Sequence, residues 1–130
     1  MDIERIDPDL AHELLRADDT LIYLDVRTEE EFKGGHPPGA VNIPAFVRGP
    51  VGMIPACDFL EEVRARFGPD TSIIVGCLRG GRSMAAARQL VGAGYEHIRD
   101  MRGGWDGEMG PDGKISFDGW VRRGLPVSTQ

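Results

Sequence analysis

The sequence predicts an α/β fold in which about five, mostly parallel strands form a sheet with helices on both faces. Three observations lead to this prediction. Short apolar runs alternate with helical segments, a pattern that favours right-handed strand–helix–strand crossovers. Residues 72–76 (SIIVG) form an apolar run typical of a strand that is buried on both faces. Neither a repeat nor a low-complexity linker interrupts the 130 residues, so we expect one domain over residues 1–130.

The first part of the chain is expected to hold two helices and two strands. Residues 7–15 begin with Asp-Pro, the pattern of an N-cap followed by proline, and continue with leucines at helical spacing. Residues 21–26 (LIYLDV) are a candidate buried strand. Residues 28–35 start with a Thr-x-x-Glu capping box and end in two glycines, which predicts a short helix. A brief strand is expected over residues 40–43.

The second part begins with a longer loop, expected over residues 44–57. The capping box Asp58-x-x-Glu61 then predicts a helix that stops at a Gly-Pro pair. After the strand at 72–76, a helix is expected over residues 83–91, and a last strand over residues 97–101.

Composition excludes several classes of function. A net charge of −6 makes electrostatic binding to nucleic acid or to an anionic membrane surface unexpected. No apolar run approaches the roughly 20 residues that a membrane span needs, and the acidic start lacks a secretory h-region, so we expect a cytoplasmic protein. The two cysteines form no C-x-x-C motif, and the three histidines lie at no zinc-binding spacing, so no metal site is expected.

The segment around Cys77 carries the chemistry. It runs from a buried strand through a short glycine-containing loop into a helix, where unpaired backbone N–H groups can bind an anion. The helix dipole, these N–H groups and nearby arginines would stabilise a thiolate, so Cys77 is expected to be an exposed nucleophile with a low pKa. The candidate site consists of Cys77 as the catalytic residue and of Leu78, Arg79, Gly80, Gly81, Arg82 and Ser83 as substrate-binding residues.

The motif Cys77-x-x-Gly80-x-Arg82-Ser83 resembles the active-site loop of the rhodanese sulfurtransferase family, a loop of six residues from Cys77 to Arg82. Other elements of the family pattern occur in the same order along residues 25–127. They are Asp25-Val26-Arg27 with Glu31-Phe32, then Gly35-His36-Pro37-Pro38-Gly39-Ala40, then Gly103-Gly104 with Trp120-x-x-x-Gly124-Leu125-Pro126-Val127.

This resemblance implies a rhodanese-like fold and a sulfurtransferase that works through a persulfide on Cys77. The thiolate would take the outer sulfur of thiosulfate or a related small anionic donor. A thiol, such as that of a thiol-bearing protein, or cyanide would then accept that sulfur. No metal and no organic cofactor is implied.

Two other functions remain open at this point. The chain could be a rhodanese-like module that carries a persulfide or senses redox state without turnover. It could also be a cysteine phosphatase or arsenate reductase of related fold, but these need five residues between cysteine and arginine. Here only four residues separate Cys77 from Arg82, which makes this alternative weak.

The residues of the loop are expected to differ in role. Arg82 matches a family position at which the side chain either braces the loop through a distant acid or contacts substrate. Arg79 lies in the middle of the loop, and we expect it to point outward and contact the anion. Ser83 is expected to cap the helix rather than act as a catalytic acid. Leu78 stands at a position that family members vary, so the preference among donors stays open.

Other polar residues are expected to be architectural. Arg27 and Glu31 lie four positions apart and are expected to pair across a helix start. His36 lies in a turn rich in glycine and proline and is expected to be a hydrogen-bonding strut. For Cys57, a structural or incidental role is favoured over that of a resolving thiol. The polar, glycine-rich segment 105–119 is either a flap near the pocket or an irregular surface loop.

Overall fold

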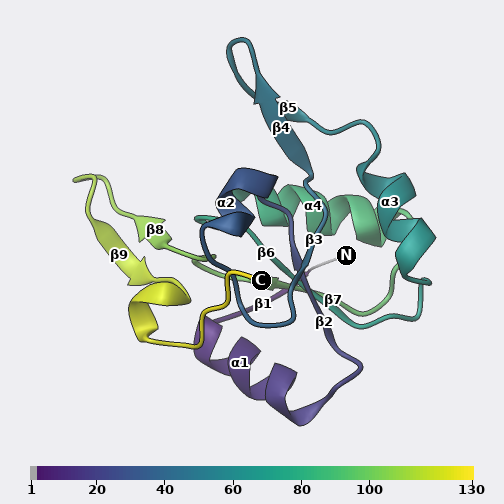
Figure 1. Cartoon of the computed structure of the whole chain (residues 1–130), viewed down its shortest axis with the longest axis horizontal. Helices are drawn as coiled ribbons and strands as arrows, with labels where there is room; N and C mark the ends of the chain where they lie inside the picture. The colour runs from purple at the N-terminus through teal and green to yellow at the C-terminus, as the bar shows by residue number, and fades with distance from the viewer. Residues whose placement is uncertain (1–2) are drawn as a thin grey trace.

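A parallel sheet forms the centre of the computed structural model, which describes residues 3–130 (Figure 1). Its strands are β1 (Glu4–Ile6), β2 (Ile22–Asp25), β3 (Val41–Asn42), β6 (Ile73–Gly76) and β7 (Ile98–Met101). Within the described residues the sheet has five strands in the order β1-β7-β6-β2-β3, and every neighbouring pair is parallel. The predicted α/β fold is therefore confirmed, with β6 in the middle of the sheet.

Helices cover both faces of this sheet. They are α1 (Pro8–Ala17), α2 (Glu29–Lys33), α3 (Phe59–Arg66), α4 (Gly81–Gly92) and the short 3-10 helix η1 (Val121–Arg123). Figure 1 shows α1 below the sheet and both α3 and α4 above it. No helix formed by residues 3–130 combines the length and the apolar character that crossing a membrane requires.

Strand β6 demonstrates why the sheet needs helices on both sides. Ile73 and Val75 belong to the core that contains Leu90 of α4, whereas Ile74 belongs to the core that contains Ala11 of α1. Because successive side chains of a strand point to opposite faces, an uninterrupted apolar run must be buried on both. All four residues of β6 are buried, as the sequence predicted.

The caps of α1 and α2 follow the sequence, whereas that of α3 departs from it. The Asp7 carboxylate accepts a hydrogen bond from an N–H in the first turn of α1. Thr28 and Glu31 form the predicted capping box at the start of α2. The capping box predicted at Asp58 is wrong, because Asp58 has φ −101° and ψ 7°, and its carboxylate caps no N–H of the described chain. A capping side chain requires extended backbone at the N-cap, as at Asp7 and Thr28.

Strand β1 lies outside the strands that the sequence predicted. Its first two residues, Glu4 and Arg5, are charged and exposed, and only Ile6 is buried. A three-residue strand at the edge of a sheet has too few apolar positions to show a periodic pattern. Its partner is β7, with Arg5 opposite Asp100 in the register.

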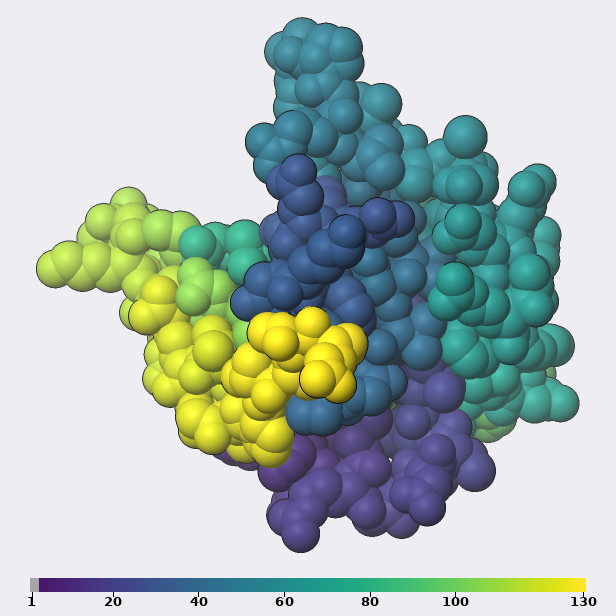
Figure 2. Space-filling view, in the orientation of Figure 1, coloured from purple at the N-terminus to yellow at the C-terminus, as the bar shows by residue number. Residues whose placement is uncertain are grey.

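Two hairpins replace segments that the sequence predicted to be irregular. The loop expected over residues 44–57 contains β4 (Phe46–Gly49) and β5 (Gly52–Pro55), which pair antiparallel. Segment 105–119 contains β8 (Gly107–Met109) and β9 (Ile115–Asp118), also antiparallel and with a register shift. Both hairpins project from the body of the molecule (Figure 2). Prolines argue against a strand in the sequence of the β4–β5 hairpin. In the structure, however, Pro50 lies in the turn and Pro55 ends β5, where a missing N–H is tolerated.

Candidate active site

The candidate site lies at the carboxyl end of β6. Strand β6 ends at Gly76, residues 77–82 (the Cys77 loop) follow, and α4 begins at Gly81. A side chain at Gly76 would overlap the hydroxyl of Tyr23, so a glycine is required where the strand meets the loop. The helix was predicted to begin at Ser83. It begins earlier because Gly80, with φ 108°, takes the left-handed conformation needed to turn the chain into the helix.

Cys77 is at the floor of a pocket rather than on the surface. Its relative exposure is 1%, so the expectation of an exposed thiol is wrong. The backbone N–H of Gly80 donates a hydrogen bond to Sγ over 3.0 Å, and the hydroxyl oxygen of Ser83 lies 3.4 Å from Sγ. The loop folds over the sulfur and buries it, while leaving a pocket of about 260 Å³ above it. The pocket is lined by Cys77, Leu78, Arg79, Gly81 and Arg82.

Arg82 is held by an acid from another part of the chain. Its two terminal nitrogens donate to the Glu31 carboxylate over 2.8 and 2.9 Å. Burial alone would raise the pKa of Glu31, but hydrogen bonds from Arg82 and Thr28 outweigh it and lower that pKa to about 2. The same pair raises the pKa of Arg82. Arg82 was expected either to brace the loop through a distant acid or to contact substrate. The ion pair with Glu31 is the brace, and the Arg82 side chain also lines the pocket.

The predicted pair between Arg27 and Glu31 does not form. Arg27 is buried, and its Nη2 donates over 2.7 Å both to the Asp25 carboxylate and to the carbonyl of Gly35. Its guanidinium also lies over the ring of Trp105, 5.1 Å from the centroid. Because Arg27 points into the protein beside Asp25, Glu31 is free to pair with the loop instead.

Arg79 is also paired with an acid. Nη1 lies 3.0 Å from Oδ2 of Asp106 and donates to the carbonyl of Gly107 over 3.2 Å. The Asp106 carboxylate accepts a further hydrogen bond from Arg122 over 3.0 Å. The Arg79 side chain is 40% exposed at the rim of the pocket, as expected for an outward-pointing residue. Its guanidinium is not simply available to an anion, because Asp106 already binds it.

Ser83 does not cap α4, contrary to the prediction, because Gly80 is the N-cap. Its hydroxyl instead donates to the carbonyl of Gly80 over 3.2 Å, inside the loop. Ser83 is fully buried, whereas Gly81 is exposed at the pocket. Leu78 is half-buried, and its carbonyl accepts a hydrogen bond from the N–H of Asp106 over 2.9 Å.

Residues 104–107 support the Cys77 loop from behind. The N–H of Trp105 donates to the carbonyl of Cys77 over 2.7 Å. A side chain at Gly104 would overlap that carbonyl and the backbone of Leu78. Segment 105–119 thus begins as a support of the loop and continues as the hairpin β8–β9. Sequence reasoning missed Gly104 and Asp106 as site residues, and only the Gly-Gly pair before Trp105 offered a signal.

Two further predictions concern residues outside the pocket. His36 is buried, and its ring nitrogens lie 2.7 Å from the carbonyl oxygen of Phe32 and 2.8 Å from that of Gln130, which confirms the hydrogen-bonding strut. Cys57 is exposed just before the N-cap of α3 and is not among the residues that line the Cys77 pocket. A role for Cys57 stays without support.

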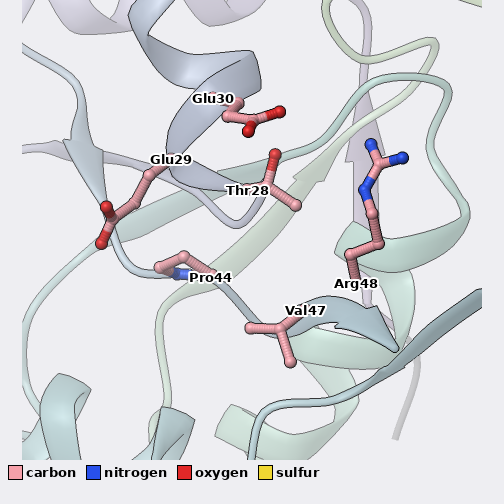
Figure 3. Close-up of a pocket in the computed structure, with 6 residues that line it drawn as sticks. All are labelled: Thr28, Glu29, Glu30, Pro44, Val47 and Arg48. Carbon is pink, nitrogen blue, oxygen red and sulfur yellow. The ribbon is translucent and has the colours of Figure 1, made fainter. Parts of the chain in front are cut away.

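Two other features of the part of the chain that the structure describes supply no second reactive centre. Within residues 3–130, no group of three or more histidines, cysteines or acids is placed to hold a metal ion. A pocket of about 250 Å³ lies between the start of α2 and β4 (Figure 3). It is lined by Thr28, Glu29, Glu30, Pro44, Val47 and Arg48, none of which is a nucleophilic thiol.

Comparison with known proteins gives matches over most of the chain. A family model described as the rhodanese-like domain matches residues 7–107. The chain is 44% identical over 118 residues to thiosulfate sulfurtransferase 16, chloroplastic, of Arabidopsis thaliana, a match that covers 91% of this chain and 87% of that protein. It is 38% identical over 110 residues to thiosulfate sulfurtransferase 18 of the same plant, covering 83% and 72%. The cytoplasmic location expected from the sequence stays a prediction.

Comparison with solved structures supports the fold. The crystal structure of Rv0390 from M. tuberculosis matches with a TM-score of 0.82 at 26% identity, covering 100% of both chains. A solution structure of the rhodanese-like domain from the Anabaena protein Alr3790 matches with a TM-score of 0.71 at 20% identity, covering 100% of this chain and 81% of that one.

Proposed function

Because the chain belongs to the family of rhodanese-like domains and is a transferase of the sulfurtransferase type, we propose that it transfers sulfane sulfur through a persulfide on Cys77. The donor is thiosulfate or a related small anion, and the acceptor is a thiol or cyanide. One observation carries this proposal. The sulfur of Cys77 accepts a backbone hydrogen bond at the floor of a pocket, where α4 begins.

In the first half-reaction, the Cys77 thiolate attacks the outer sulfur of thiosulfate. The new S–S bond forms as the bond between the two sulfurs of thiosulfate breaks, and its electron pair leaves with sulfite. In the second, an acceptor thiolate or cyanide attacks the outer sulfur of the persulfide, which gives a new persulfide or thiocyanate and returns the Cys77 thiolate. Charge and atoms balance in both steps, and no oxidant is needed.

The backbone at the start of α4 favours the negative charge that both steps place on sulfur. Unpaired N–H groups at a helix start carry partial positive charge and point toward the space in front of it. Gly81 lines the pocket without a side chain, and the N–H of Gly80 donates to Sγ of Cys77, so this backbone lies close to the sulfur. We assign Leu78, Arg79, Gly81 and Arg82, which line the pocket, to binding the donor, and the buried Gly80 and Ser83, which lie against Sγ of Cys77, to binding the sulfur.

The length of the loop favours sulfur transfer over phosphoryl transfer. A phosphoryl group needs a ring of amides wide enough for its equatorial oxygens. The Cys77 loop has four residues between Cys77 and Arg82, one fewer than the cysteine phosphatase pattern. A single outer sulfur atom requires less space than a tetrahedral phosphate.

Mass spectrometry tests the proposal directly. The purified chain mixed with thiosulfate should gain one sulfur atom, about 32 Da, on Cys77. The variant Cys77→Ser should gain none at this position, and the control Cys57→Ser, which changes the exposed cysteine, should react like the wild type. A mass gain that survives Cys77→Ser would exclude Cys77 as the nucleophile.

Steady-state kinetics then identify the donor and the acceptor. We expect turnover with thiosulfate but none with phenyl phosphate. The rate with 3-mercaptopyruvate, compared with that of thiosulfate, decides which of the two donors is preferred. Cyanide and dithiothreitol serve as the two acceptors. A persulfide that forms once per chain but is not released to either acceptor would contradict turnover and favour a carrier.

A further inference from the structure

Asp100 is a buried carboxylate that the proposed reaction does not yet use. It lies on β7 with a side chain that is 0% exposed, and its Oδ2 accepts a hydrogen bond from Nε of Arg5 over 2.9 Å. Among residues 3–130, Oδ1 of Asp100 is the one buried side-chain nitrogen or oxygen without a hydrogen-bond partner. A buried acceptor left unpaired is costly, so its retention calls for a physical reason.

The ion pair between Arg5 and Asp100 lies beneath the Cys77 loop. Asp100 is in register with Arg5 on one side and with Val75 of β6 on the other. Nη2 of Arg5 reaches Gly80, because a side chain at Gly80 would lie 3.2 Å from it. Gly80 is the residue whose N–H binds the sulfur of Cys77. The pair is thus adjacent to the part of the loop that holds the nucleophile.

Ser83 connects Asp100 to Cys77. Burial raises the pKa of Asp100, and the nearby Ser83 and Arg5 side chains oppose that rise, so Ser83 is a neighbour of the carboxylate although no hydrogen bond joins Ser83 to Oδ1 in the structure. In the structure this hydroxyl donates to the Gly80 carbonyl over 3.2 Å, and its oxygen lies 3.4 Å from Sγ of Cys77. A hydroxyl has one proton and rotates freely, so Gly80, Asp100 and an ionised Cys77 compete for it.

We propose that Arg5 and Asp100 are positioning residues that set how readily Cys77 ionises, acting through the hydroxyl of Ser83 and through their charges. A thiolate at Cys77 needs the Ser83 proton, for which Oδ1 of Asp100 competes. The negative charge of Asp100 also opposes a second negative charge nearby, whereas Arg5 offsets it. This inference rests on Cys77 being the nucleophile of the proposed function.

Other charged and titratable groups surround these residues. Glu108 of β8 lies 4.0 Å from Arg5 and is itself bound by Arg102 over 2.8 Å. Tyr23 of β2 stays neutral, because burial raises its pKa well above 10. Arg82 of α4 also interacts electrostatically with Cys77, but Glu31 neutralises it. None of these groups binds the Ser83 hydroxyl, which leaves Asp100 as its ionisable competitor among the described residues.

The test measures alkylation of Cys77 by iodoacetamide as a function of pH, in chains that all carry Cys57→Ser. The thiolate is the reactive form, so the midpoint of the pH profile reports its formation. We expect Asp100→Asn to move the midpoint down by about one pH unit and Arg5→Gln to move it up by a similar amount, roughly a tenfold change in rate at a fixed pH below the midpoint.

A matched control is available on the same two strands. Arg99 of β7 pairs with Glu4 of β1 over 2.6 Å, and Arg99 is about as exposed as Arg5, but its partner Glu4 is exposed where Asp100 is buried. Arg99→Gln removes an ion pair between β1 and β7 without touching the loop, so it should leave the midpoint unchanged. Loss of stability would shift the alkylation midpoints of Asp100→Asn and Arg5→Gln in the same direction. A change of charge beside Cys77 shifts the two midpoints in opposite directions.

The possible outcomes separate this inference from the proposed function. Midpoints that stay at the wild-type value in both variants, or that shift with the same sign, overturn the tuning role. Because Arg5 is part-exposed, Arg5→Gln gives a result even where Asp100→Asn fails to fold. Alkylation needs no sulfur transfer. Opposite shifts in a chain that takes up no sulfur from thiosulfate would therefore contradict the proposed function and leave the tuning intact.

Discussion

Arg82 and Glu31 form a two-pronged ion pair, with N–O distances of 2.8 and 2.9 Å, between residues 51 positions apart. The pair joins the last residue of the Cys77 loop to helix α2. Glu31 is also part of the capping box of that helix, since its carboxylate accepts from the N–H of Thr28. One carboxylate therefore fixes both the start of α2 and the end of the loop.

Glu31→Gln should lower the free energy of unfolding by about 1–3 kcal/mol at pH 7, the range for hydrogen bonds to charged groups. The pKa of Glu31 falls from 4.5 to about 2 on folding. Its stabilisation is thus complete above pH 4.5 and is lost as the pH falls toward 2. Urea unfolding at a series of pH values should show the gap between wild type and variant closing over this range.

Glu30→Gln is the matched control for this experiment, because Glu30 is an exposed neighbour on α2. It should change stability little at any pH. A gap for Glu31→Gln that stays constant between pH 5 and about 2 would contradict the assignment of that low pKa to the ion pair.

Asp106→Asn should strengthen the binding of thiosulfate, because it frees the Arg79 guanidinium at the rim of the pocket. We expect KM for thiosulfate to fall about two- to fivefold, equivalent to the roughly 0.5–1 kcal/mol of an exposed ion pair, with a smaller change in kcat. Arg79→Ala should raise KM with little effect on stability. Steady-state kinetics at low and high salt check both.

Asp112→Asn serves as the control on the same hairpin, since Asp112 caps the turn by accepting from the N–H of Lys114 and lies away from the pocket residues. It should leave KM unchanged. If Asp106→Asn instead raised KM as much as Arg79→Ala does, the role of Asp106 would be to orient the Arg79 guanidinium toward the donor. It would then not compete with the donor for that guanidinium.

Gly104→Ala should destabilise the chain by more than about 2 kcal/mol and impair sulfur transfer. Gly104 has φ 60°, and an added side chain would overlap the Cys77 carbonyl. The strain of a left-handed alanine accounts for only about 1–2 kcal/mol of this. Thermal unfolding and the sulfur-uptake assay measure the two effects.

Gly113→Ala isolates the strain from the overlap. Gly113 has φ 79°, but no described atom lies within 4 Å of where its side chain would be. The Gly113→Ala variant should therefore lose only the stability that the left-handed backbone strain costs, and it should keep full sulfur uptake. Equal losses of stability in the two variants would show that Gly104 does not support the loop through close approach.

Arg27→Met should destabilise the chain by about 3–5 kcal/mol, because it leaves the buried Asp25 carboxylate without its partner. The double variant Asp25→Asn with Arg27→Met should be more stable than the sum of the two single losses predicts, since no buried charge then remains. A double-mutant cycle from urea unfolding measures this coupling. Additive losses would mean that the two charges do not depend on each other.

The sequence alone was sufficient for the central α/β sheet and for the place of Cys77, the proposed nucleophile. The apolar run of β6 can be buried only in the middle of a sheet covered on both faces, and a cysteine directly after it must lie at the carboxyl end of that strand. The glycines of the loop and the capping box at Thr28 act over a few residues, so their effect can be read locally. Recognition of the family pattern followed from the same short motifs.

Tertiary structure alone decided which acids hold the arginines, how deeply Cys77 is buried, and that segments 44–57 and 105–119 form hairpins. Local spacing predicted that Arg27 would pair with Glu31, but burial of Arg27 beside Asp25 released Glu31 to Arg82. Asp106 reaches Arg79, and Asp100 lies beside Ser83, only because parallel crossovers bring distant segments to one edge of the sheet. The strength of an ion pair depends on distance and burial in the folded chain, and sequence separation determines neither.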